Sequence, residues 1–178
     1  MDVVILSGPP GAGKSTVARL LVDRAERGVH LHTDDFYRYI RKGYVEPYLP
    51  EARVQNETVV DVLAGAAAGY AGGGYHVVVD GVIGPWFVGA FLSHARGRLR
   101  YVVLRPDEET TLARATARSA DELTDPMPVL HMYRQFAELG ALEPHVFDST
   151  GLTPEETAAR LSERLAAGDF VLDRVPQP

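Results

Sequence analysis

The chain has 178 residues, enough for one domain with a full core, and its 46% hydrophobic and 24% charged residues are ordinary for a globular protein. The net charge of -6 argues against a nucleic-acid surface, and no apolar run approaches the length of a membrane span. The absence of cysteine excludes disulfides, thiolate metal sites and a cysteine nucleophile. We therefore expect a single cytoplasmic domain over 1–178 that has neither nucleic acid nor membrane as a partner.

A glycine-rich loop separates the first predicted strand, at 2–7, from the first predicted helix, at 14–27. It fits G-x-x-x-x-G-K-[ST], the phosphate-binding loop (P-loop), which belongs between a buried strand and a helix. The matching residues, expected to bind ATP, are Gly8, Pro9, Pro10, Gly11, Ala12, Gly13, Lys14, Ser15 and Thr16.

The residue types in this loop suit the binding of a nucleoside triphosphate. Gly11 and Gly13 can adopt positive φ, so that backbone N–H groups surround a phosphate at the positive end of the following helix. Lys14 is expected to reach the β- and γ-phosphates of ATP and to act in catalysis, and the Ser15 hydroxyl to hold Mg²⁺. The alternative is a glycine- and proline-rich turn that only caps the helix.

Two carboxylates, Asp34 and Asp35, follow the second predicted strand, at 29–33. The carboxyl ends of parallel strands line one ligand crevice, so both carboxylates should share the edge of the sheet that holds the P-loop. Asp34 is the candidate general base, which would bind the acceptor and take the proton of its hydroxyl group. Asp35 is the rival base, with the alternative role of N-cap for a helical turn at 36–41.

His30 and His32 alternate in the same strand and therefore point to one face. We expect them to be buried and hydrogen-bonded rather than bound to a metal, because no third ligand has a suitable spacing in the sequence.

The segment 34–56 is the predicted acceptor-binding region, rich in aromatic and charged side chains up to a helix at about 51–70. Arg53 and Asn56 are its candidate acceptor ligands. The alternative is a surface excursion whose aromatic residues pack on the core.

Asp80 directly follows the third predicted strand, at 75–79. An acidic residue after an apolar strand, paired with a P-loop, typically orders Mg²⁺ or its waters beside the substrate. Asp80 is therefore assigned with Ser15 to the metal, and to the substrate-binding set. The alternative is a strand-end carboxylate that caps the next turn.

Three arginines flank a polar, proline-containing segment that we expect to form a lid over 115–130. Arg114 and Arg118 lie four residues apart on the helix predicted at 108–118, and Arg134 lies on the helix predicted at 129–139. Arginine in such a segment can stack on adenine or hold phosphate charge. We therefore expect Arg114 and Arg118 to bind the nucleotide, Arg118 also to act in catalysis, and Arg134 to bind the substrate. The alternative for each is a solvated helix arginine.

The remaining elements complete an alternation of strands and helices, which indicates a parallel sheet covered on both faces. They are a short helix at 85–96, a strand at 99–104, a strand at 145–148 and a last helix that starts with a capping box at 153–156.

The P-loop, Asp34, Asp80-Gly81 and the Arg114/Arg118 pair together resemble the small P-loop kinases: adenylate, shikimate and gluconate kinases and chloramphenicol phosphotransferase. The resemblance implies a three-layer α/β/α sandwich with a five-stranded parallel sheet in order 2-3-1-4-5 and a short lid between the fourth and fifth strands. It also implies an adenine site near 148–150.

The chain looks most similar to the chloramphenicol phosphotransferase-like group, in which an aspartate at the end of the second strand acts as base. His32-Thr33-Asp34 matches that position. Adenylate kinases follow their Asp-Gly with Phe-Pro-Arg, whereas Asp80-Gly81 is followed here by residues 82–85 without an arginine. This difference argues against a nucleoside monophosphate acceptor.

The resulting expectation is an ATP- and Mg²⁺-dependent enzyme that phosphorylates a hydroxyl of a small molecule, such as an antibiotic or a metabolite. A nucleoside or nucleotide kinase and a non-catalytic ATP-binding switch protein are the alternatives.

Overall fold

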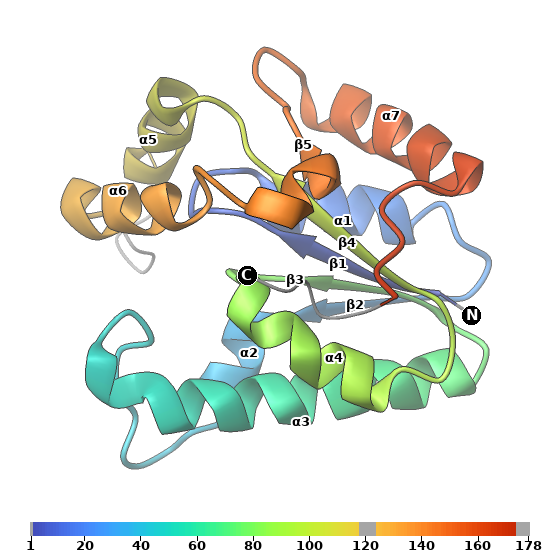
Figure 1. Ribbon diagram of the computed structural model, residues 1–178, viewed down its shortest axis with the longest axis horizontal. Helices are drawn as coiled ribbons and strands as arrows, with labels where there is room; N and C mark the ends of the chain where they lie inside the picture. Colours follow the sequence, from blue (N-terminus) through green and yellow to red (C-terminus); the bar gives the residue numbers. More distant parts are fainter. Residues whose placement is uncertain (1, 118–123, 174–178) are drawn as a thin grey trace.

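The computed structural model describes residues 2–117 and 124–173, which are built around a five-stranded parallel sheet (Figure 1). The strands are β1 (Val3–Ser7), β2 (Gly28–His32), β3 (His76–Asp80), β4 (Leu99–Leu104) and β5 (Val146–Phe147). Their order across the sheet is β2-β3-β1-β4-β5, which confirms the predicted topology. All residues of the central strand β1 are buried, as a continuous apolar strand of a parallel sheet must be.

Helices cover both faces of the sheet, which confirms the three-layer α/β/α arrangement (Figure 1). The α-helices are α1 (Lys14–Val22), α2 (Thr33–Arg38), α3 (Arg53–Gly72), α4 (Val88–His94), α5 (Glu108–Thr116), α6 (Pro126–Gln135) and α7 (Pro154–Ala167). Short 3₁₀ turns are η1 (Pro50–Ala52), η2 (Pro85–Phe87) and η3 (Gly140–His145). Within residues 2–117 and 124–173, none of the helices combines the length and the apolarity that crossing a bilayer demands.

The alternation of side chains along β1 divides the core into two layers. Val4 and Leu6 pack with buried residues of α1 and α7, whereas Val3 and Ile5 pack with those of α3 and α4. Both faces are apolar because both are covered, and the sheet is thereby held as a rigid support for the residues at its carboxyl edge.

The start of β2 differs from the prediction because α1 ends five residues early, at Val22. A Cβ on Gly28 would lie 2.6 Å from Val22 Cγ1, so the chain turns back closely against the end of the helix. Gly28 is consequently the first residue of β2, one residue before the predicted start of the strand.

The segment after β2 also differs from the prediction, since Asp34 and Asp35 lie in the first turn of a helix, α2. His32 occupies the N-cap position of α2, so the N-cap role considered for Asp35 is wrong.

Helix α6 begins at Pro126, three residues before the predicted start, because Asp125 caps it by accepting a hydrogen bond from the Met127 amide at 3.0 Å. The two prolines that indicated an interruption instead lie in its first turn, where proline is tolerated.

The capping box of α7 is present as predicted, with Thr153 Oγ1 accepting from the Glu156 amide at 3.1 Å. Of the lid predicted at 115–130, residues 118–123 lie outside the described residues.

Candidate functional site

The P-loop leaves β1 and enters α1 through three glycines with positive φ. These are Gly8 (137°), Gly11 (88°) and Gly13 (87°). A Cβ on Gly8 would lie 2.2 Å from the Leu104 carbonyl oxygen, and one on Gly11 would lie 2.2 Å from that of Thr111. The loop therefore packs against β4 and α5 so closely that only glycine fits, and its conformation is set by the fold.

Lys14 is the first residue of α1, and it is buried. Its Nζ atom donates a hydrogen bond to the Pro9 carbonyl at 2.8 Å, so the ammonium group lies across the loop. The N-cap of α1 is Gly13, whose missing side chain leaves the first-turn amides uncapped, and a Cβ there would meet nothing within 4 Å. Uncapped amides, a helix N-terminus and a cation together suit an anionic phosphate.

Ser15 and Asp80 lie in direct contact, with the Ser15 hydroxyl donating to Asp80 Oδ2 at 2.6 Å. Asp80 is fully buried at the end of β3. Burial by itself raises the pKa of Asp80, but hydrogen bonds from His30, His32 and Ser15 together hold it well below the usual range. An ionised carboxylate beside a hydroxyl forms the oxygen-ligand set that Mg²⁺ prefers, so the residues present fit this ion.

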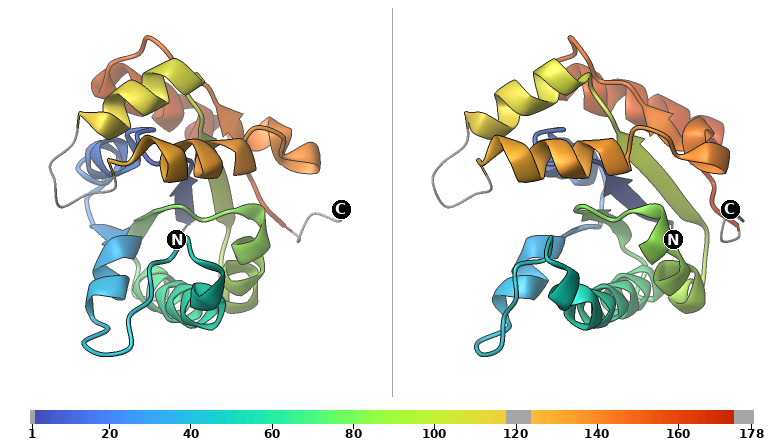
Figure 2. Two further views of the ribbon diagram at one scale, coloured as in Figure 1. Left: turned by 90° about the vertical axis from the view of Figure 1, so that its left-hand side faces the viewer. Right: turned by 60° about the vertical axis from the view of Figure 1, so that its left-hand side comes forward.

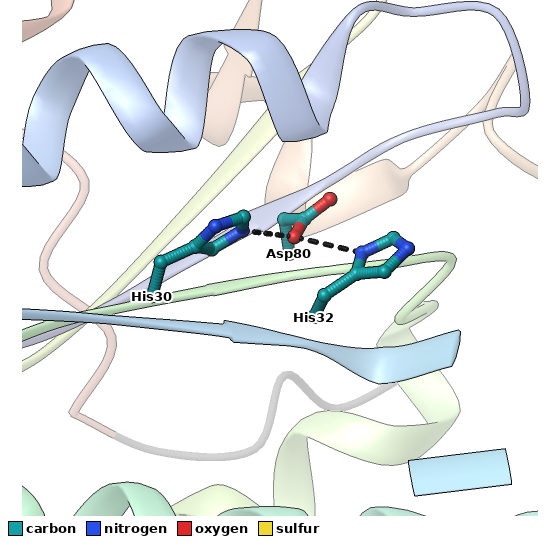
Figure 3. Close-up of side chains that lie close together, drawn as sticks. All are labelled: His30, His32 and Asp80. Atoms are coloured by element: carbon teal, nitrogen blue, oxygen red, sulfur yellow. Dashed lines mark hydrogen bonds and ion pairs between the residues drawn. The ribbon is translucent and has the colours of Figure 1, made fainter. Parts of the chain in front are cut away.

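Two histidines of β2 face the same carboxylate (Figure 3). The His30 Nε2 atom lies 2.5 Å, and the His32 Nδ1 atom 3.0 Å, from Asp80 Oδ1. The expected hydrogen bonds are observed, but the expected burial is not, because both histidines are partly exposed. The expected lack of a third ligand is wrong, because β2 and β3 pair in register and bring Asp80 opposite His32. Spacing within a single strand does not reveal a ligand on its neighbour.

His32 also connects Asp80 to Asp34, since its Nε2 atom lies 3.4 Å from Asp34 Oδ2. The hydrogen bond to Asp34, followed by that to Asp80, raises the pKa of His32 to about 10. Conversely, His32 lowers the pKa of Asp34, and the nearby charge of Lys14 lowers it further. Asp34 is therefore an ionised and largely exposed carboxylate within the field of the P-loop lysine.

Asp35 has its described contact within α2. Its Oδ1 atom accepts a hydrogen bond from Arg38 at 2.8 Å, three residues along α2, and both side chains are exposed. Of the two rival carboxylates, the geometry connects Asp34 to the site.

The predicted acceptor ligands Arg53 and Asn56 are engaged in local contacts. Arg53 pairs with Glu57 at 2.9 Å on the exposed surface of α3. Asn56 Nδ2 donates to the Pro47 carbonyl at 2.8 Å, and its Oδ1 atom accepts from the Tyr37 hydroxyl at 3.0 Å. Asn56 thus joins α2, α3 and the loop between them. The predicted roles of Arg53 and Asn56 toward the acceptor stay predictions.

Two of the three predicted lid arginines, Arg114 and Arg134, belong to the described residues. Arg114, in the last turn of α5, and Arg134, in the last turn of α6, are both exposed, and the two helices pack against each other. Their predicted roles toward nucleotide and substrate stay predictions. Arg118 lies outside the described residues. In Figure 2, α5 and α6 stand on one side of the carboxyl edge of the sheet, and α2 and the start of α3 on the other.

The segment predicted to hold adenine, at 148–150, is anchored beside α5. The Asp107 amide donates to Thr150 Oγ1 at 2.8 Å, which joins the start of α5 to the end of β5. Ser149 Oγ is buried and has no hydrogen-bond partner among residues 2–117 and 124–173. A buried hydroxyl of this kind suits a polar group supplied by a ligand.

A cavity of about 170 Å³ lies at the opposite, amino edge of the sheet, where Val3 and Leu99 begin their strands. Its other walls are largely alanines and glycines of α3 and the loop after α4, with two arginines at the rim. Its lining residues include no carboxylate or hydroxyl side chain that could hold a metal ion or accept a proton. We therefore assign the candidate site to the P-loop edge of the sheet.

Comparison with known proteins identifies the family of this P-loop sheet. The profile of AAA_33, described as an AAA domain, matches residues 3–142, well over half of the chain. The chain belongs to the AAA_33 family. The match includes the P-loop, Asp34 and Asp80, whereas the predicted adenine segment at 148–150 follows the matched residues. None of the curated proteins compared with the chain matches it in sequence.

Solved structures similar to this AAA_33 protein include small P-loop kinases. A sugar kinase from Janibacter sp. HTCC2649 has a TM-score of 0.68 at 20% identity, with 99% of this chain and 98% of that chain covered. The Deinococcus radiodurans tunicamycin resistance protein has a TM-score of 0.69 at 14% identity, with 99% of each chain covered. A gluconokinase from Sinorhizobium meliloti 1021 has a TM-score of 0.65 at 16% identity, with 94% and 97% covered. At these identities the similarity shows the fold, which is that of a small P-loop kinase.

Proposed function

We propose that this protein transfers the γ-phosphate of Mg²⁺-ATP to a hydroxyl group of a small molecule. The observation that carries the proposal is the convergence of four side chains at one edge of the sheet. Lys14 and Ser15 begin α1, Asp80 ends β3 and contacts Ser15, and Asp34 lies beside His32 within the field of Lys14.

The phosphate donor is held by the P-loop. Its amides and the start of α1 surround the phosphates of ATP, and Lys14 exchanges its bond to the Pro9 carbonyl for the β- and γ-phosphate oxygens. Ser15 and Asp80 would hold Mg²⁺, which when bound neutralises phosphate charge. The compartment that we propose is the cytoplasm, where ATP is available.

The phosphoryl transfer itself needs positioning and charge stabilisation more than covalent help. The acceptor oxygen forms a bond to the γ-phosphorus as the bond from that phosphorus to the β,γ-bridging oxygen breaks, which releases ADP. Asp34 takes the proton of the acceptor hydroxyl, and its depressed pKa keeps it ionised and able to accept one. His32 holds the carboxylate in place through its Nε2 atom.

The loop after β3 supports a small hydroxyl compound as acceptor. Residues 82–85 contain no arginine to grip an acceptor phosphate. The Ile83 carbonyl accepts hydrogen bonds from Ser7 and Tyr101, both at 2.7 Å, so the loop is tied down at that place. The structural neighbours are named as a sugar kinase, a gluconokinase and a tunicamycin resistance protein. We therefore choose sugars, sugar acids and nucleoside antibiotics as the first candidate acceptors.

The test measures ADP release from Mg²⁺-ATP across a panel of hydroxyl compounds. The panel contains aminoglycosides, chloramphenicol-like and nucleoside antibiotics, sugars, sugar acids and nucleosides. Each is assayed with the wild type, with Asp34→Asn and with Asp35→Asn, a matched change of charge one residue away. We expect one class to stimulate ADP release, and Asp34→Asn alone to remove the stimulation. ATP binding with no stimulation by any class would instead support a non-catalytic ATP-binding protein.

A further inference from the structure

We propose that His30, His32 and Asp80 form a binding site for a transition-metal ion such as Zn²⁺ or Co²⁺. This site is distinct from the oxygen-only position at Ser15. The inference stands on side-chain chemistry and does not rest on the proposed kinase activity.

The backbone brings the three groups together. His30 and His32 are two residues apart on β2 and so lie on one face of the sheet. Asp80 is opposite His32 in the parallel ladder with β3. Both imidazoles point toward the carboxylate, and the three potential ligand atoms lie within 4.8 Å of one another (Figure 3).

The spacing suits a small ion after a modest adjustment. The nitrogens lie 2.5 and 3.0 Å from Asp80 Oδ1. Ligands around a tetrahedral zinc ion are roughly 3.3 Å apart, given metal–ligand distances of about 2.0–2.2 Å. An ion between these groups therefore requires the two nitrogen–oxygen separations to lengthen by about 0.3–0.8 Å. The two nitrogens, which lie within 4.8 Å of each other, have to settle at the same spacing of roughly 3.3 Å.

The two oxygens of Asp80 separate this site from the Ser15 position. Oδ2 accepts the Ser15 hydroxyl on the P-loop side, whereas Oδ1 faces both histidines. Imidazole nitrogen suits zinc, cobalt, nickel and copper, whereas magnesium takes oxygen ligands. The histidine side of Asp80 is therefore expected to select transition metals.

His32 has the second contact that metal-binding histidines usually make. Its Nδ1 atom faces the proposed ion, and its Nε2 atom lies 3.4 Å from Asp34 Oδ2. Metal-bound histidines almost always donate their other ring N–H to a carboxylate or carbonyl, which orients the ring. The His30 and His32 side chains are 20% and 27% exposed, so an ion can enter from solvent.

The test is a Co²⁺ titration of the full chain without nucleotide or Mg²⁺, followed by its visible absorption and by Zn²⁺ competition. We expect one equivalent to bind and displacement by Zn²⁺ to be complete. His30→Gln and His32→Gln should each weaken binding at least tenfold, and Asp34→Asn should weaken it by about 10- to 100-fold. His94→Gln, which removes an exposed histidine paired with Asp61, should change nothing.

A measurement on the wild type avoids reliance on variants that fold poorly. The side-chain ¹⁵N resonances of His30 and His32 should shift on addition of one equivalent of Zn²⁺, and those of His94 should not. The absence of one-equivalent binding, or equal losses in His94→Gln and His30→Gln, would overturn the proposal. Neither result bears on kinase activity, because the acceptor panel is assayed separately with Mg²⁺-ATP.

Discussion

The Thr33 hydroxyl donates a hydrogen bond to the Asp80 carbonyl at 2.7 Å. Thr33 begins α2 and Asp80 ends β3, so this contact ties the two elements together where the candidate base and the candidate metal ligand emerge. The next residue, Gly81, has to lack a side chain, because a Cβ there would lie 2.1 Å from Thr33 Oγ1. The position of Asp34 relative to the P-loop thus depends on a contact outside the reacting groups.

Thr33→Val removes this hydrogen bond but keeps the shape of the buried side chain. We expect the free energy of unfolding to fall by about 1–3 kcal/mol, because the Asp80 carbonyl loses a donor. Acceptor turnover should fall more than ATP affinity, because Asp34 loses its anchor. Urea unfolding and steady-state kinetics measure both effects. Thr58→Val, which removes an exposed hydroxyl bonded within α3, is the control and should leave turnover unchanged.

Lys14→Ala should abolish turnover and weaken ATP binding, because the β- and γ-phosphates lose their cation. The fold should persist, since the glycine contacts that shape the loop do not involve the lysine side chain. Calorimetric titration of ATP and the far-UV circular dichroism spectrum check the two parts. A Lys14→Ala protein that still transfers phosphate would overturn the P-loop assignment.

Asp34→Asn should reduce phosphate transfer by roughly 10²- to 10⁴-fold, the usual contribution of a general base. ATP affinity should stay nearly constant, because the residue faces the acceptor. Single-turnover transfer at saturating ATP is the measurement. If Asp35→Asn alone caused this loss, the wrong carboxylate would have been assigned.

Ser15→Ala removes the hydroxyl that contacts Asp80 Oδ2. We expect the Mg²⁺ concentration for half-maximal turnover to rise, with a smaller effect on binding of metal-free ATP, because a magnesium ligand is lost. Mg²⁺ titrations at fixed ATP measure the change. Ser93→Ala, in which an exposed hydroxyl on α4 is removed, is the matched control.

His76, the first residue of β3, provides a test of pH dependence away from the site. Burial lowers the pKa of His76, and Arg100 adds to this effect while Asp2 opposes it. The unfolded chain, with a histidine pKa near 6.5, therefore binds protons that the folded chain does not. Stability should be lost as pH falls below about 6.5.

Compared with His76→Gln, the wild type should lose more unfolding free energy between pH 8 and pH 5.5. Urea unfolding at both pH values measures this difference, and the variant serves as reference for all other acid-sensitive groups. Equal losses of unfolding free energy in the wild type and in His76→Gln would contradict the prediction.

The parallel sheet with both faces covered was predictable because five apolar strands alternate with helices, and the residues of β4 coincide with the predicted strand. The order of the strands was implied only by the resemblance to small P-loop kinases. Helix α2 was considered only as a turn at 36–41, and it begins earlier, at Thr33, because the aromatic and charged side chains after His32 have no helical period that marks its start. Its N-cap position is occupied by His32, without a capping side-chain hydrogen bond.

The candidate site was predictable only where one segment of sequence contains the signal. The P-loop is contiguous, and Asp34 and Asp80 each follow a strand. The contacts of His30 and His32 depend on pairing between β2 and β3, and those of Asn56 on how a loop folds back onto α3. Such contacts are set by tertiary packing, which a linear pattern does not contain.

The central position of β1 has a consequence for how the chain acquires its structure during synthesis. β1 is the earliest strand in the chain, yet it pairs with β3 on one side and with β4 on the other. A nascent chain in which Leu99–Leu104 has not yet left the ribosome leaves one side of β1 unpaired. Four of its five residues are apolar, so the unpaired edge is a hazard for aggregation. A truncation before β4 should therefore yield insoluble protein, even though the P-loop, Asp34 and Asp80 are all already present.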